Sequence, residues 1–268
     1  MLELGFEWRP EEGRTVLAHR RHEGPLRVQK ALYPEGPALC QVLVLHPPAG
    51  IAGGDALTLQ VALASGSQAL VTTPGAGKWY RSKGPQATQV LDFRVGDGAV
   101  LEWLPQETIL YDQLNGHTET RVQLGADALY VGLDLLCLGR TASGETLRQG
   151  RLGMVARIAQ QGRLLWSEQG AIEGGSRLLQ SPAGLRGMPV SGTLLVAGRA
   201  ISNEVLDACR AVVPAVGEGA VTRLPNLLIA RYLGPAAEPG RAWFVDLWAR
   251  LRPALTGREA QVPRIWHT

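Results

Sequence analysis

Apolar residues recur at every second position along much of this chain, and glycine-rich turns separate the segments that show this period. The segments 57–63, 91–95 and 129–135 each place leucine, valine or phenylalanine side chains on one face, because successive side chains of a strand point to opposite faces. Turn signals follow these segments, at 64–67, 96–98 and 125–127. The pattern predicts a chain built mainly from many short β-strands.

The same reasoning predicts further strands at 15–20, 26–32, 39–46, 68–73, 99–103, 119–124, 151–159, 162–167, 193–198 and 227–233. Short strands at this spacing are typical of a sandwich, a barrel or a β-solenoid. The two-residue period does not choose among these three architectures, so the choice stays open at this point.

Two segments in the C-terminal half change to a helical period. Residues 203–213 follow Ser202, a predicted N-cap, and end at Pro214. Residues 240–251 place a heavy apolar stripe on one face, made of Trp243, Phe244, Leu247, Trp248 and Leu251. We expect this stripe to cover the end of the β core, with a partner-binding surface as the alternative. Since neither a repeat nor a linker is visible, we predict a single domain spanning 1–268.

Composition excludes several classes of protein. With 45% hydrophobic and 19% charged residues, the chain is not intrinsically disordered. The balance of 27 basic against 24 acidic residues argues against a nucleic-acid partner. Apolar runs are too short for a membrane-spanning helix, and the acidic, proline-broken start does not read as a signal peptide. We therefore expect a cytoplasmic protein without a membrane partner.

Motifs of the common enzyme classes do not match. Residues 72–79 follow a predicted strand, but threonine and tryptophan stand where a phosphate-binding loop needs glycine and a hydroxyl. The dinucleotide, serine-hydrolase and paired-histidine zinc motifs fail as well. Cys40, Cys137 and Cys209 are odd in number and far apart, which predicts buried free thiols. We expect no tightly bound cofactor and no strong metal site. A β-rich hydrolase with a dispersed active site remains the alternative.

Acidic residues in apolar or glycine-rich surroundings are the most informative side chains. Asp55 ends a run of small residues, and Glu102 and Glu107 flank a tight proline segment. Asp134 interrupts an apolar strand, where an unpaired charge costs several kcal/mol. Turn caps and structural ion pairs are the alternative explanation for each of them.

Five blocks of sequence carry a resemblance that spans nearly the whole chain. They are HPPAGIAGGD (46–55), TTPGAGKWYRS (72–82), LEWLPQETILYD (101–112), CLGR (137–140) and PRIW (263–266), with PLRVQKALYPEG (25–36) agreeing. In this order and spacing the chain resembles the urease accessory protein UreD family, called UreH in some bacteria. Ala49, Gly75, Gly77 and Trp79 depart from the usual pattern of the family.

The resemblance implies a non-catalytic, β-helix-like fold with two helices, which agrees with the strands and helices predicted above. It also implies a role in urease maturation. Members of the family bind apo-urease, carry the accessory protein UreF, and through it recruit the GTPase UreG that supplies nickel. A scaffold and conduit for nickel in transit would result.

Nickel binds histidine and thiolate tightly, whereas carboxylates and waters hold it weakly and exchange it faster. We therefore hypothesise a water-filled path lined by residues among Asp55, Glu102, Glu107, Asp134 and Glu168. For partner surfaces we expect one anchor at Trp79, Tyr80 and Arg81 and a second at Arg264, Ile265 and Trp266, since aromatic and arginine side chains dominate interfaces. Core packing is an equal alternative for Trp79, and the second segment docks either on the protein's own body or on UreF. A metallochaperone with its own tight nickel site is a further alternative.

Overall fold

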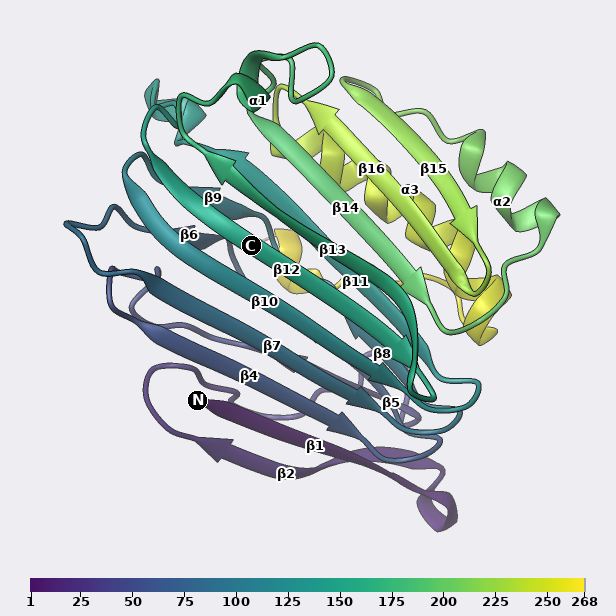
Figure 1. Cartoon of the computed structure of the whole chain (residues 1–268). Coiled ribbons are helices and arrows are strands. Elements are labelled where there is room, and N and C mark those ends of the chain that lie inside the picture. The colour runs from purple at the N-terminus through teal and green to yellow at the C-terminus, as the bar shows by residue number, and fades with distance from the viewer. Residues whose placement is uncertain (268) are drawn as a thin grey trace.

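Within residues 1–267, which the computed structural model describes, the strands form two sheets that face each other (Figure 1). The seven-stranded sheet contains β1 (Leu2–Arg9), β2 (Arg14–His22), β4 (Ala56–Leu63), β7 (Ala87–Val95), β10 (Leu114–Leu124), β12 (Gly150–Gln160) and β13 (Arg163–Glu173). The nine-stranded sheet contains β3 (Leu39–Leu43), β5 (Gln68–Thr72), β6 (Gly77–Trp79), β8 (Val100–Trp103), β9 (Thr108–Leu110), β11 (Leu129–Leu138), β14 (Val190–Ala197), β15 (Glu218–Leu224) and β16 (Leu227–Gly234).

The chain winds as a solenoid, because consecutive strands alternate between the two sheets. It passes from β4 to β5, from β7 to β8 and from β10 to β11, and each strand pairs in parallel with its counterpart one coil later. The short strands β6 and β9 pair in parallel and join this stack through β11. This arrangement of stacked coils confirms the predicted fold class.

Parallel pairing places like residues above one another in the core. Val61 aligns with Phe93, Phe93 with Val122, and Val122 with Ile158. All four are buried between the sheets, where Phe93 lies 5.7 Å from the ring of Trp103 on the facing sheet. Each inward-facing position of the two-residue period therefore contributes one residue to an apolar row that runs from coil to coil.

Antiparallel strands end the seven-stranded sheet on both sides and the nine-stranded sheet on one side, whereas β3 at its other edge pairs in parallel with β5. β2 runs antiparallel to β1, and β13 runs antiparallel to β12. β14, β16 and β15 continue the nine-stranded sheet in antiparallel order beyond β11. Residues 26–32, predicted as a strand, run irregularly and meet the sheets at two isolated bridges, Arg27 with Leu45 and Leu32 with Gln41. The prediction was wrong there because buried Leu26 and Val28 reproduce the apolar pattern of a strand without its pairing.

The helices among the described residues are α1 (Arg177–Gln180), α2 (Asn203–Arg210) and α3 (Ala237–Thr256), with 3-10 turns at Pro10–Glu12, Thr141–Ser143 and Arg264–His267. α3 covers the outer face of the nine-stranded sheet, α2 packs against α3 and β15, and α1 packs against β13 of the seven-stranded sheet. The Ser202 hydroxyl accepts the Val205 N–H at 3.2 Å, which confirms the predicted cap of α2. α3 extends beyond 240–251 at both ends and buries the five residues of its predicted stripe. The stripe packs on Leu70, Val100 and Val131 of the sheet.

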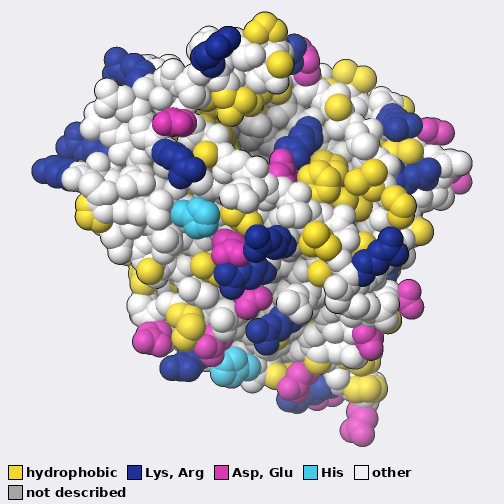
Figure 2. Space-filling view, viewed as in Figure 1, with side chains coloured by type: hydrophobic (Ala, Val, Ile, Leu, Met, Phe, Trp, Pro, Cys, Tyr) yellow, Lys and Arg dark blue, Asp and Glu magenta, His cyan; other side chains and the backbone are white. Residues whose placement is uncertain are grey.

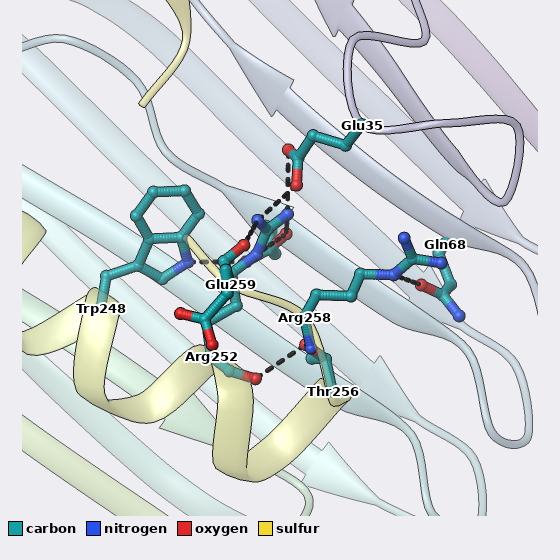
Figure 3. A network of polar contacts seen from close by, with 8 residues as sticks. Glu35, Gln68, Trp248, Arg252, Thr256, Arg258 and Glu259 are labelled. Atoms are coloured by element: carbon teal, nitrogen blue, oxygen red, sulfur yellow. Dashed lines mark hydrogen bonds and ion pairs between the residues drawn. The ribbon is translucent and has the colours of Figure 1, made fainter. Parts of the chain in front are cut away.

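A buried ionic network fixes α3 on the sheet (Figure 3). Arg252 of α3 donates to both carboxylate oxygens of Glu102 on β8, at 2.9 to 3.2 Å, and also to the carboxylate of Glu35. The Trp248 indole N–H donates to Glu102 at 2.7 Å. Burial raises the pKa of Glu102, and the Arg252 guanidinium opposes that rise. The side chains of Arg252 and Glu102 are each 1% exposed, so water cannot hydrate either charge if its partner is lost.

Replacing Arg252 by methionine should lower the free energy of unfolding by about 3–5 kcal/mol, because a buried carboxylate loses its counter-charge. Arg258→Met is the matched control, since the Arg258 guanidinium donates to the neutral Gln68 side chain at 3.0 Å. The control should lose about 1 kcal/mol. Urea unfolding of the two variants measures both quantities. Equal losses of unfolding free energy in the two variants would contradict the larger contribution assigned to the Arg252–Glu102 ion pair.

Candidate functional site

Asp134 faces the space between the two sheets. On β11, Leu133 and Leu135 pack in the cluster around α3, whereas Tyr130 and Leu136 pack in the core between the sheets. Because side chains alternate along a strand, Asp134 points to the same side as Tyr130 and Leu136. The charge that interrupts this apolar strand therefore lies inside the solenoid rather than on its outer surface.

Glu168 and Arg231 lie close to Asp134. Across the nine-stranded sheet, Asp134 pairs in register with Thr193, and Thr193 with Arg231. The Arg231 guanidinium reaches Glu168 on β13, at the edge of the facing sheet, with an Nη2 to Oε1 distance of 2.7 Å, and donates to Thr193 Oγ1 at 3.4 Å. We call Asp134, Glu168, Thr193 and Arg231 the inter-sheet recess. A hollow is visible between β13 and β14 below α1 (Figure 2).

A strip of polar residues continues from this recess along the inner face of the seven-stranded sheet. Thr120 aligns through Ala156 with Glu168, and Thr118 aligns with Gln89 on β7. All three strip residues are half-buried, between rows of fully buried apolar side chains. Polar side chains that are not fully buried therefore lie on the inner face of this sheet.

The electrostatics of Asp134 fit an aqueous recess. Its side chain is accessible to solvent, yet protein atoms surround it closely enough to remove much of its hydration. This desolvation, together with the charge of Glu168, raises the pKa of Asp134 to about 6. Burial and the Asp134 charge likewise raise the pKa of Tyr130.

The other predicted carboxylates lie elsewhere. Glu102 belongs to the Arg252 network on the opposite face of the nine-stranded sheet. Glu107 forms an ion pair with Arg241 of α3 at 3.5 Å. Asp55 accepts the Ala52 N–H at 2.8 Å and so closes its own turn. The structure brings Asp134 and Glu168 together and places Asp55, Glu102 and Glu107 in other surroundings.

The predicted partner anchors divide between core and surface. Trp79 is 3% exposed and packs in the core between the sheets, so its ring does not form a surface anchor. Tyr80 is half-buried against Tyr111, with ring centroids 5.1 Å apart, whereas Arg81 is exposed.

At the C-terminal end, the Trp266 indole N–H donates to Thr72 Oγ1 at 2.9 Å, and Arg241 lies 5.3 Å from the centre of its ring. Ile265 is half-buried and Arg264 is exposed. This segment therefore docks on the protein's own body and leaves Arg264 at the surface.

Three further observations concern cysteines, metals and membranes. Cys40, Cys137 and Cys209 are buried free thiols, as predicted. Among residues 1–267, no group of three histidine, cysteine or acidic side chains is arranged to hold a metal ion. In the same part of the chain, no helix combines the length and apolarity needed to cross a bilayer.

Comparison with known families decides the relationship of this chain. The model of the UreD urease accessory protein family matches residues 1–267. The chain belongs to the UreD family. A urease accessory protein UreD from Azoarcus sp. (strain BH72) is 56% identical over 267 residues, which cover 100% of this chain and 93% of the relative. UreD proteins from Dechloromonas aromatica (strain RCB) and Pseudomonas aeruginosa (strain PAO1) are 52% and 48% identical, covering 100% of this chain and 93% and 94% of those relatives.

Within this UreD chain, sequence reasoning missed Arg231 and Arg252. Arg231 stands in Leu228-Ile229-Ala230-Arg231-Tyr232, a charge inside an apolar strand, which is the signal that singled out Asp134. Pairing these two opposite charges would have pointed to one shared space. Arg252 follows the apolar stripe of α3, where an arginine reads as an ordinary exposed helix residue until its buried partners are known.

Replacing Asp134 by asparagine should stabilise this protein at neutral pH. The folded state raises the pKa from 3.8 to about 6, so it binds the proton more tightly than the unfolded chain does. The carboxylate therefore opposes folding above about pH 6, and its effect fades as the pH falls toward 4. With solvent screening, we expect a gain on the order of 1 kcal/mol at pH 7.5. Thermal melting at pH 7.5 and pH 4 measures it, and an equal gain at both pH values would refute this account.

Proposed function

We propose that this UreD-family chain works in the cytoplasm as a scaffold for urease maturation. In this proposal it binds apo-urease and UreF, recruits UreG through UreF, and lets nickel pass to the urease active site. The family supports the urease accessory role, and the inter-sheet recess supports the passage. The observation that carries the passage is the pair of carboxylates, Asp134 and Glu168, that water reaches between the two sheets.

The chemistry of the recess favours transit over storage. Oxygen ligands from carboxylates, hydroxyls and water hold Ni²⁺ more weakly than imidazole or thiolate ligands do. Asp134, Glu168 and Thr193 supply oxygen atoms, and the strip formed by Thr118, Thr120 and Gln89 supplies further oxygens deeper in the sheet. An ion that entered this path would exchange ligands with water at each step. Nickel is therefore cargo here, not a resident cofactor.

Asp134→Ala and Glu168→Ala should each lower the nickel content and the activity of urease matured with this protein, and the double variant should lower both further. Removing an oxygen ligand weakens transit without disturbing the exterior. Asp92→Ala is the control. Asp92 lies on the seven-stranded sheet, as Glu168 does, but its side chain is beside Arg94 on the outer face of that sheet. Nickel per urease, measured by mass spectrometry of the metal, gives the primary result.

Each variant should still co-purify with UreF and urease, which separates transit from assembly. Full nickel content in the Asp134 and Glu168 double variant, with assembly intact, would remove the passage from the proposal while leaving the scaffold role. Loss of assembly in the same variant would assign these residues to folding or docking instead.

For UreF binding, we propose Tyr80, Arg81 and Arg264 as contacts, with Trp79 and Trp266 holding their segments in place from within. Arg81 and Arg264 are exposed on segments that the buried Trp79 and the half-buried Trp266 anchor. Arg81→Glu should reduce UreF capture at least tenfold, because it reverses a charge at the contact. Arg94→Glu, on the outer face of the seven-stranded sheet, is the control. Equal capture by the wild-type and Arg81→Glu proteins would exclude this contact.

The proposal assigns no catalytic activity to the chain. Turnover of a panel of ester, phosphate and glycoside substrates by the purified protein would contradict it and favour a hydrolase. Retention of nickel at submicromolar concentration in equilibrium dialysis would favour a metallochaperone with a tight site.

A further inference from the structure

The Arg231 guanidinium occupies the space beside Glu168 that a cation in the inter-sheet recess would use. It lies on the nine-stranded sheet and bonds to Glu168 of the seven-stranded sheet, so it bridges the two walls. Asp134 lies in the same cross-strand row, with Thr193 between them. The protein thus holds a tethered positive charge next to two carboxylates, of which Glu168 contributes to the raised pKa of Asp134.

This tethered charge is free to leave. The side chains of Arg231 and Glu168 are 46% and 42% exposed, and an ion pair this accessible to water contributes little to stability. The second bond of Arg231, to Thr193, is long at 3.4 Å. On β15 the residue opposite Arg231 is Ala220, whose small side chain leaves room for the guanidinium to rotate outward.

Electrostatic repulsion prevents a divalent ion and the Arg231 guanidinium from occupying the recess at the same time. A divalent ion between Asp134 and Glu168 would meet the positive guanidinium at close range, and repulsion would drive the arginine toward water. When the ion leaves, Glu168 regains a counter-charge at once. Because the empty recess is neutralised in this way, the ion is bound less tightly and released more readily than two bare carboxylates would allow.

We propose that Arg231 is an exchangeable counter-charge that pairs with Glu168 in the empty recess, is displaced by a divalent cation, and keeps cation binding weak. This inference rests on the proposed nickel passage and adds the means by which release stays fast. Arg231 is a positioning residue, since it acts through Glu168 and not by binding the metal.

The test is Ni²⁺ binding to the purified full-length protein, followed by competition with a metal indicator. Arg231→Met should bind Ni²⁺ about tenfold more tightly than wild type, because one repelling charge is removed. Arg231→Lys should stay close to wild type, because it retains the charge. Combining Arg231→Met with Glu168→Gln should abolish the gain.

Arg121→Met is the matched control. Its guanidinium pairs with Glu119 at 2.6 Å and is similarly exposed, but it lies on the outer face of the seven-stranded sheet. This variant should leave Ni²⁺ affinity unchanged. A purely structural role for Arg231 would lower the melting temperature in both the methionine and lysine variants without raising affinity, and that result would overturn the proposal.

The outcome is distinguishable from failure of the proposed function. If Arg231→Met leaves the affinity unchanged while Asp134→Ala and Glu168→Ala still lower the nickel content of urease, the passage stands and the counter-charge role falls. If affinity rises in Arg231→Met but the carboxylate variants mature urease normally, the recess binds cations without serving maturation.

Discussion

In-register hydrogen bonding between parallel strands of successive coils is the constraint on which the rest of this protein depends. Each coil repeats the path of the one before it, so residues at equivalent positions stack directly in both sheets. Stacking converts one apolar position per coil into a continuous row, from Val61 through Phe93 and Val122 to Ile158. The same geometry stacks polar positions, and this is how Thr118 and Gln89 come to form a strip inside the molecule.

The outer faces of the two sheets differ in polarity. Apolar residues project from both faces of the nine-stranded sheet, as in other largely parallel sheets, so its outer face needs a cover. α3 provides that cover with its aromatic stripe, and the Arg252 network fixes the position of the helix by joining it to β8 and to the segment around Glu35. The outer face of the seven-stranded sheet instead carries charged residues, among them Asp92, Glu119 and Arg157, and stays in solvent.

Sequence reasoning predicted much of the local structure and less of its assembly. Alternation located most strands, since side-chain burial is a local property, but it could not show that Leu59 would pair with Leu91 rather than pack against a facing sheet. The family resemblance supplied the solenoid. Asp134 stood out as a charge within apolar neighbours, whereas Glu168 stands between Ser167 and Gln169 and carries no such local signal. Trp79 read equally well as a surface anchor or a core residue, because aromatic residues serve both purposes and only tertiary packing separates them.

The antiparallel strands at both ends of the seven-stranded sheet have a consequence for self-association. A parallel solenoid exposes, at its last coil, backbone groups that can template another chain, and unlimited stacking of that kind produces fibres. Here the seven-stranded sheet ends in the antiparallel strand β2, whose C-terminal half carries His19, Arg20, Arg21 and His22. The segment after it folds back, with the Val28 N–H donating to His22 and Arg20 donating to the Val28 carbonyl. Charge and chain reversal at this edge disfavour the addition of another strand, so the repetitive stack of coils ends here.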